Sequence, residues 1–88
     1  AVEGHTDNQR VVNLGQIKDN WDLSVLRATS VTRFLIDEQK VDANRLTATG
    51  KGEFQPVENL NTPEARSKNR RIEIILSPKL DELYNLIQ

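Results

Sequence analysis

The sequence contains no cysteine and no methionine, and it has one histidine and one tryptophan among its 88 residues. Without cysteine, the chain has neither a disulfide framework nor a thiol nucleophile. With a single histidine, a zinc site would depend on several carboxylates, so we expect no metal site and no cofactor. No apolar run approaches the roughly 20 residues that a membrane-spanning helix requires.

Neither sign of charge dominates the chain. Twelve Lys and Arg residues stand against thirteen Asp and Glu residues, which gives a formal net charge of -1. A nucleic-acid-binding domain needs a basic footprint, so we expect no nucleic-acid partner. A charged ligand would therefore be recognised by a few placed side chains. The length fits one domain with a thin core.

The clearest predicted element is a helix over residues 21–37. Asp19 or Asn20 can cap its N-terminus, and Asp22 in its first turn suits the helix dipole. Arg27 falls within the apolar stripe of this helix, where an unpaired guanidinium would be costly to bury. The helical spacing predicts the buried stripe as Leu23, Leu26, Val31, Phe34 and Leu35.

The remaining elements are shorter. Residues 1–4 are typical of the end of a strand, and residues 45–49 indicate a second strand that Gly50 ends. Thr62-Pro63-Glu64 is a helix start with a Thr cap and Pro in the first turn. Residues 71–76 alternate as a third strand, with Ile72, Ile74 and Leu76 inward. A last helix is predicted over residues 77–88, with Leu80, Leu83, Tyr84 and Ile87 on one face.

Four short segments occur in a distinctive order: Gly4-His5-Thr6-Asp7, NWDLSVLRA over residues 20–28, Gly50-Lys51-Gly52-Glu53, and SKNRR over residues 67–71. In this order and spacing they resemble the OmpA/MotB family of peptidoglycan-binding domains. The resemblance runs from Gly4 to Leu76. It implies an α+β fold, an OmpA-like two-layer sandwich with helices packed on one face of a mixed β-sheet, in the order β-α-β-α-β.

The resemblance also implies the domain boundaries. Residues 1–76 correspond to the peptidoglycan-binding domain, without the strand and helix that normally come first in the family. We therefore expect an N-terminally truncated domain, and the absence of Met at position 1 suggests an excised fragment. Residues 77–88 would form a C-terminal helical extension to which the family assigns no role.

In the family, an Asp of the first motif binds the ammonium group of diaminopimelate in the stem peptide, and an Arg of the second motif binds its carboxylate. By resemblance these roles fall on Asp7 and Arg27, and a zwitterion does require one anion and one planar fork of donors. The alternative is an internal ion pair between Asp7 and Arg27. The expected ligand-binding residues are Asp7, Arg27, Thr6, Asn20, Leu23 and Arg70.

Other polar residues have simpler interpretations. We expect His5 to be structural, with its ring hydrogen-bonded near the sheet edge, because no nucleophile accompanies it. Asn20 either caps the helix or faces the groove, and the cap is the simpler interpretation. By alternation, at least one of Arg70 and Arg71 is solvated or paired with Glu73. Lys51 and Glu53 are expected to be exposed loop charges, and Asn69 to fix the turn into the last strand.

The resemblance implies a non-catalytic domain that anchors an outer-membrane or envelope protein to the cell wall, in the periplasm. It would reach a membrane only through other regions of its parent, and it could form a homodimer. A second interpretation is the wall anchor of a flagellar-motor stator, on the periplasmic side of the inner membrane. A wall hydrolase is disfavoured, since Asp7 with Glu3 is the only nearby carboxylate pair. A structural domain without a ligand is the last alternative.

Overall fold

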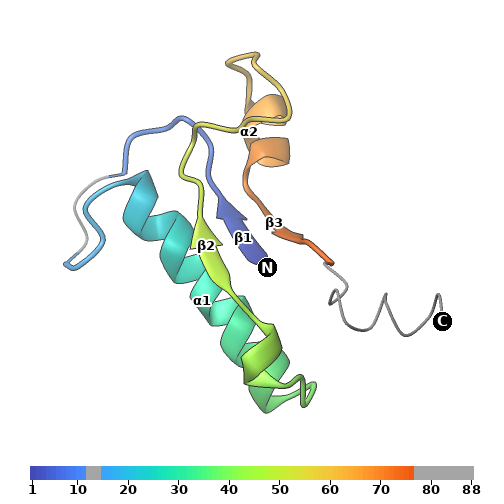
Figure 1. Cartoon of the computed structure of the whole chain (residues 1–88). Coiled ribbons are helices and arrows are strands. Elements are labelled where there is room, and N and C mark those ends of the chain that lie inside the picture. Colours follow the sequence, from blue (N-terminus) through green and yellow to red (C-terminus); the bar gives the residue numbers. More distant parts are fainter. Residues whose placement is uncertain (12–14, 77–88) are drawn as a thin grey trace, which may run out of the picture.

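The computed structural model describes residues 1–11 and 15–76. Figure 1 shows a small sheet that lies beside a long helix, with a short helix near the end of the sheet. The predicted helix over residues 77–88 lies outside the described residues. The elements are β1 (Val2–His5), α1 (Asn20–Asp37), the 3-10 helix η1 (Ala43–Arg45), β2 (Ala48–Gly50), α2 (Pro63–Asn69) and β3 (Arg71–Ile74).

The three strands form one mixed sheet in the order β2-β1-β3. Strand β1 is central: it runs parallel to β2 and antiparallel to β3. The parallel pair needs a crossover, and α1 provides it. The predicted mixed sheet and the order β-α-β-α-β are therefore confirmed.

Helix α1 lies on β1 and β2 at unusually short range. A Cβ placed on Gly4 would lie 2.1 Å from the Ser24 carbonyl oxygen, and one placed on Gly50 would lie 2.5 Å from the Ser24 Oγ. Only glycine leaves room for a helix backbone at this distance. The fully buried residues of α1 are accordingly small, namely Ser24 and Ala28.

This close approach overturns part of the predicted buried stripe. Leu26 is 44% exposed and Phe34 is 53% exposed, whereas both were expected to be buried. Because Ser24 and Ala28 must face the two strand glycines, the larger side chains of α1 are rotated away from the closest contact. Leu23, Val31 and Leu35 remain half-buried beside it.

Two strands are shorter than predicted. Residues 45–47 are not part of β2, because the Asp42 side chain accepts a hydrogen bond from the Asn44 backbone N–H and starts η1 instead. Strand β3 ends at Ile74, and Ile74 and Leu76 are exposed rather than inward. The reason is that α1 covers β1 and β2 and leaves this end of β3 uncovered.

The two helix starts were predicted correctly. Asp19 caps α1 by accepting from the Asp22 N–H, and Thr62 caps α2 by accepting from the Ala65 N–H, with Pro63 in the first turn. Among the described residues, none of the helices combines the length and the apolar composition needed to cross a bilayer. Helix α2 ends next to β3, and it therefore sets where the residues before β3 lie (Figure 1).

Candidate functional site

Asp7 lies two residues after the end of β1 and is buried, with a relative exposure of 7%. Both of its carboxylate oxygens have donors. Oδ1 accepts from the Gln9 N–H at 2.9 Å, and Oδ2 accepts from Nη1 of Arg70 at 2.7 Å. The carboxylate is thus held in one orientation at the end of the central strand.

Arg70 brings a positive charge to Asp7 from the C-cap of α2. Its side chain is 43% exposed, so one part of the guanidinium faces the carboxylate and another faces solvent. The alternative of an internal Asp7–Arg27 ion pair is therefore wrong: among the described residues the ion-pair partner of Asp7 is Arg70. The two are 63 residues apart in the sequence, and only the fold brings them together.

Arg27 is half-buried on α1, and no hydrogen bond or ion pair involves its guanidinium within residues 1–11 and 15–76. Val25, on one side of the buried Ser24, approaches Gly50 in β2. By helical spacing, Leu23 and Arg27 lie on the opposite side of Ser24 from Val25. Side chains on a helix lean toward its N-terminus. That end of α1 adjoins the end of β1 that Asp7 follows (Figure 1).

Thr6 and Asn20 organise the backbone around Asp7. The Thr6 N–H donates to the Gly52 carbonyl at 2.9 Å, and its hydroxyl donates to the Asp7 carbonyl at 3.0 Å. The Asn20 amide donates to the carbonyls of Asp7 and Gln9, at 3.2 and 3.1 Å. The expectation that Asn20 caps the helix is wrong, since Asp19 does so and leaves the Asn20 amide to hold the loop.

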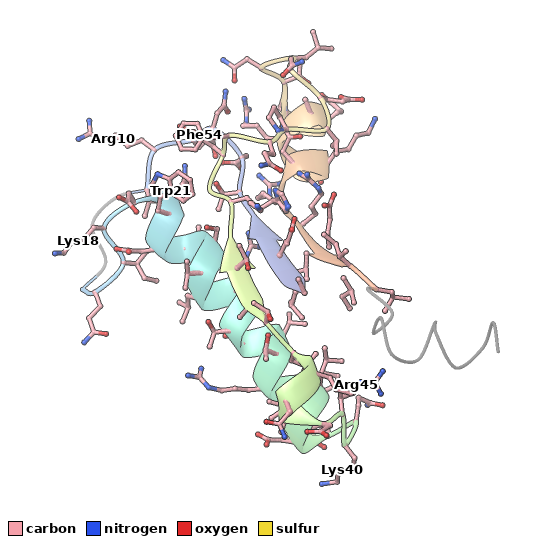
Figure 2. The ribbon with its side chains drawn as sticks, viewed as in Figure 1. Arg10, Lys18, Trp21, Lys40, Arg45 and Phe54 are labelled. Atoms are coloured by element: carbon pink, nitrogen blue, oxygen red, sulfur yellow. The ribbon has the colours of Figure 1, made fainter. Side chains whose placement is uncertain are left out.

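A cavity of about 350 Å³ opens beside Asn20. Its most distinctive wall is an aromatic pair: Trp21 and Phe54 stack with ring centroids 5.1 Å apart and planes at 30°. Figure 2 shows these two rings close together at the N-terminal end of α1, with Arg10 on the same side. The cavity is lined by Asn8, Arg10, Val11, Lys18, Asp19, Asn20, Trp21, Glu53 and Phe54.

Of the six predicted site residues, only Asn20 lines this cavity, so the aromatic wall was missed. The available signal was the scarcity of aromatics: Trp21 and Phe54 are two of four in the chain, and both lie in family-like motifs or next to one. Glu53 was expected to be an exposed loop charge. It is instead half-buried, with its carboxylate 3.5 Å from the Asn20 amide, and Lys51 is also half-buried.

The two arginines of the SKNRR segment have different roles: Arg71 binds backbone carbonyls and Glu73, and Arg70 binds Asp7. Arg71 donates to Glu73 at 2.8 Å and to the Asn69 and Gln55 carbonyls, at 3.2 and 2.8 Å, so the predicted pairing of one arginine with Glu73 is confirmed. The hydrogen bond from Arg71 lowers the pKa of Glu73 below its ordinary value of 4.5. Arg71 therefore ties the last residue of α2 to the loop before that helix, while Arg70 reaches Asp7.

His5 differs from its prediction. It lies on the central strand rather than at the sheet edge, it is 1% exposed, and neither ring nitrogen has a hydrogen-bond partner within the described residues. The expected hydrogen bond is therefore wrong. Its neighbours on the sheet are two carboxylates, because the register places Glu3 opposite Glu73 and His5 opposite Arg71.

Asn69 anchors the loop before α2. Its Oδ1 accepts from the N–H groups of Val57 and Glu58, and its Nδ2 donates to the Glu58 carbonyl. We predict that Asn69→Ala lowers the free energy of unfolding by about 2 kcal/mol, because three hydrogen bonds of roughly 0.5–1.5 kcal/mol are lost in a mostly buried site. Urea denaturation measures this. Asn59→Ala, at an exposed position nearby, should change the midpoint little, and equal midpoints for both variants would contradict the assignment.

Comparison with known proteins places this arrangement in a family. Residues 1–70 match the OmpA family, and the chain belongs to it. The chain is 44% identical over 78 residues to motility protein B of Bacillus subtilis, covering 89% of this chain and 30% of that protein. It is also 44% identical over 71 residues to the outer membrane protein Omp38 of Acinetobacter baumannii, covering 81% of this chain and 18% of that protein. The chain thus spans less than a third of these relatives.

Solved structures agree with the fold. The C-terminal domain of Helicobacter pylori MotB superimposes with a TM-score of 0.80 at 30% identity, over 98% of this chain and 64% of that one. The cell wall anchor of the T6SS from Pseudomonas aeruginosa superimposes with a TM-score of 0.72 at 38% identity, over 81% of this chain and 48% of that one. The predicted OmpA-like architecture is confirmed.

Proposed function

We propose that this domain binds peptidoglycan non-covalently, by the diaminopimelate of its stem peptide, and so anchors its parent protein to the cell wall. The observation that carries the proposal is a pair of opposite charges, of which the carboxylate has protein partners and the guanidinium has none among the described residues. Asp7 is buried and oriented at the end of β1, while Arg27 presents a guanidinium without a protein partner among the described residues. Membership of the OmpA family and similarity to a protein described as a cell wall anchor support it.

The chemistry of the ligand fits these two groups. The side-chain end of diaminopimelate carries an ammonium group and a carboxylate on one carbon, so recognition requires an anion and a planar cation a short distance apart. Asp7 accepts the ammonium and Arg27 binds the carboxylate in a fork of two N–H donors. Because Arg27 has no ion-pair partner among the described residues, it can bind the ligand without first breaking an ion pair.

The other expected residues take supporting roles. Thr6 and Asn20 hold the backbone on either side of the Asp7 carboxylate. Leu23, one turn before Arg27 on the same side of α1, offers an apolar wall to the methylene chain of the ligand. Arg70 orients Asp7 and, through its exposed portion, contacts the carboxylates of the stem peptide.

A single site of this kind binds modestly. Two charge-assisted contacts of roughly 1.5–3 kcal/mol each must offset the entropy lost on association. The wall presents many stem peptides, so two domains in a homodimer would gain from a high effective concentration. Anchoring then depends on the number of domains engaged as well as on the strength of one site.

We propose no catalytic role for the described carboxylates. Both oxygens of Asp7 accept protein hydrogen bonds, and Glu3 lies beside His5 rather than beside Asp7. The paired acid and base that a hydrolase requires are therefore not assembled from Asp7 and Glu3.

The parent protein has two candidate classes, and both place this domain in the periplasm. An outer-membrane or lipid-anchored parent is favoured by the similarity to Omp38. A flagellar stator is favoured by similarity to motility protein B over 89% of this chain and to the MotB C-terminal domain over 98% of it. A transmembrane helix bearing an Asp in the parent would identify a stator, and a barrel or a lipid-attachment Cys would identify the first class.

The first test of the proposal is Arg27→Ala. We expect co-sedimentation with purified peptidoglycan to weaken by about tenfold or more, since one charge-assisted contact of roughly 1.5–3 kcal/mol is lost. Free meso-diaminopimelate should compete with the wild-type protein and compete less with the variant. Circular dichroism should show the fold intact.

Arg33→Ala is the matched control, because Arg33 is exposed and lies farther along the same helix. It makes the same change in net charge and should bind as the wild type does. Equal binding by the wild type and Arg27→Ala, or equal loss in both arginine variants, would contradict the role given to Arg27.

A further inference from the structure

A second group of polar side chains gathers on the face of the sheet opposite α1. Gly4 faces α1, and side chains alternate along a strand, so Glu3 and His5 point to the other face. Glu73 lies directly across from Glu3 in the antiparallel pair β1–β3. His5 Nε2 is 3.4 Å from Oε1 of Glu3 and 3.5 Å from Oε2 of Glu73.

Two carboxylates directly opposite each other on a sheet repel and destabilise the pair of strands. Arg71 compensates only part of this charge: its Nε donates to Oε1 of Glu73 and leaves Oε2 facing the histidine. The space between the carboxylates is therefore suited to a positive charge.

The His5 ring beside these carboxylates is buried and lacks hydrogen-bond partners among residues 1–11 and 15–76. It is 99% buried, with a relative exposure of 1%, and both Nδ1 and Nε2 lack hydrogen-bond partners within the described residues. Leaving a buried polar group unsatisfied costs roughly 1–3 kcal/mol. Its Nε2 lies within 3.5 Å of an oxygen of each carboxylate, so a cation bound between them would take up the lone pair of Nε2 and the two negative charges together.

We propose that Glu3, His5 and Glu73 form a binding site for a divalent transition metal of the Zn²⁺ type. Ligand atoms bound at 2.0–2.1 Å in tetrahedral geometry lie about 3.4 Å apart. The distances from His5 Nε2 to the two carboxylate oxygens, 3.4 and 3.5 Å, match this value. All three ligand atoms lie within 4.8 Å of one another, so a small closure of the two carboxylates completes the site.

The donor set selects the class of metal. One imidazole nitrogen with two carboxylate oxygens suits Zn²⁺ and related divalent ions, whereas Mg²⁺ and Ca²⁺ prefer oxygen ligands alone. Three protein ligands leave a fourth position for water. Sequence composition predicted no metal site because it lacked several histidines or cysteines. The register of β1 and β3 assembles one from residues far apart in the chain.

The bound metal would join β1 to β3 across the centre of the sheet. A ligand that binds only the folded state stabilises it, so we expect the melting temperature of the metal-free chain to rise with Zn²⁺ concentration. Mg²⁺ at the same concentration should leave the melting temperature unchanged. The inference stands apart from wall binding, because none of its three ligands is among the residues assigned to peptidoglycan.

The decisive experiment combines calorimetric titration of the whole chain with Zn²⁺ and NMR of the histidine ring nitrogens. We expect one Zn²⁺ per chain and a shift of the His5 Nε2 resonance. Glu3→Gln should weaken Zn²⁺ binding by about 100-fold or more, since even groups that only support metal ligands contribute 10–100-fold. This variant removes a repulsive charge, so it should fold without metal.

Glu38→Gln is the control, because it removes the same charge from an exposed position after α1 and should keep the wild-type affinity. The proposal is overturned if the wild type shows no Zn²⁺-dependent shift at Nε2, if Mg²⁺ acts equally, or if Glu3→Gln binds Zn²⁺ as tightly as the wild type. Peptidoglycan co-sedimentation of Glu3→Gln is measured in parallel. Lost metal binding with retained wall binding would separate the two sites.

Discussion

Asp7→Asn is expected to lower the affinity for purified peptidoglycan by about 100-fold, the largest effect on binding of any single change in the proposed site. The substitution keeps the shape of the side chain and leaves an amide oxygen to accept from the Gln9 N–H. It removes the negative charge that would hold the ligand's ammonium group. A charge-assisted hydrogen bond contributes roughly 1.5–3 kcal/mol, and a buried position places Asp7 at the upper end of that range.

The loss at Asp7 should exceed that at Arg27 because Asp7 has two roles. It is the proposed anion for the ligand, and it also holds Arg70 against the end of β1 through the 2.7 Å contact. When the charge is removed, the exposed guanidinium of Arg70 is released to solvent and its contribution to the stem peptide is lost as well. We therefore expect Asp7→Asn and Arg70→Ala to be non-additive, with the double variant binding about as weakly as Asp7→Asn alone.

Asp37→Asn is the matched control for charge. Asp37 is an exposed residue at the last position of α1, and its substitution changes the net charge by the same amount. Co-sedimentation at several salt concentrations should show wild-type binding for Asp37→Asn. Retention of most wall binding by Asp7→Asn would remove Asp7 from the site, even if Arg27→Ala binds poorly.

Local signals predicted the parts of the fold that local chemistry decides. Asp19 and Thr62 cap helices because their side chains satisfy backbone N–H groups three residues away, an interaction contained within one short segment. The order of elements followed from the same kind of evidence, and the resemblance to the OmpA family supplied how they are arranged.

The errors arose where distant segments meet. Helical spacing favoured Leu26 and Phe34 for the core, because apolar periodicity cannot show that two strand glycines admit Ser24 and Ala28 instead. The partner of Asp7 was missed for the same reason, since Arg70 is 63 residues away and either of two positive side chains fits the pattern. The individual site residues could therefore be predicted only through the family motifs. The ion pair between Asp7 and Arg70 could be identified only from the structure.

The contact between β1 and α1 leads to the largest expected effect on stability. Gly4→Ala should lower the free energy of unfolding by about 3 kcal/mol or more, because the new methyl group would sit 2.1 Å from the Ser24 carbonyl oxygen and 3.3 Å from the Ala28 nitrogen. These are backbone atoms of a helix, and they cannot move aside as a flexible side chain can. The whole of α1 must shift away from the sheet, which also opens the contact at Gly50.

For a chain of this length, total stability is only roughly 4–13 kcal/mol, so such a loss leaves a large part of the population unfolded or easily unfolded. Urea denaturation followed by Trp21 fluorescence and circular dichroism measures it. Gly15→Ala is the control: Gly15 has a positive φ of 66° and nothing within 4 Å of an added Cβ, so it should cost only the roughly 1–2 kcal/mol of backbone strain. A Gly4→Ala midpoint as high as that of Gly15→Ala would mean that α1 does not approach β1 this closely, and the proposed placement of Arg27 beside the end of β1 would have to be abandoned.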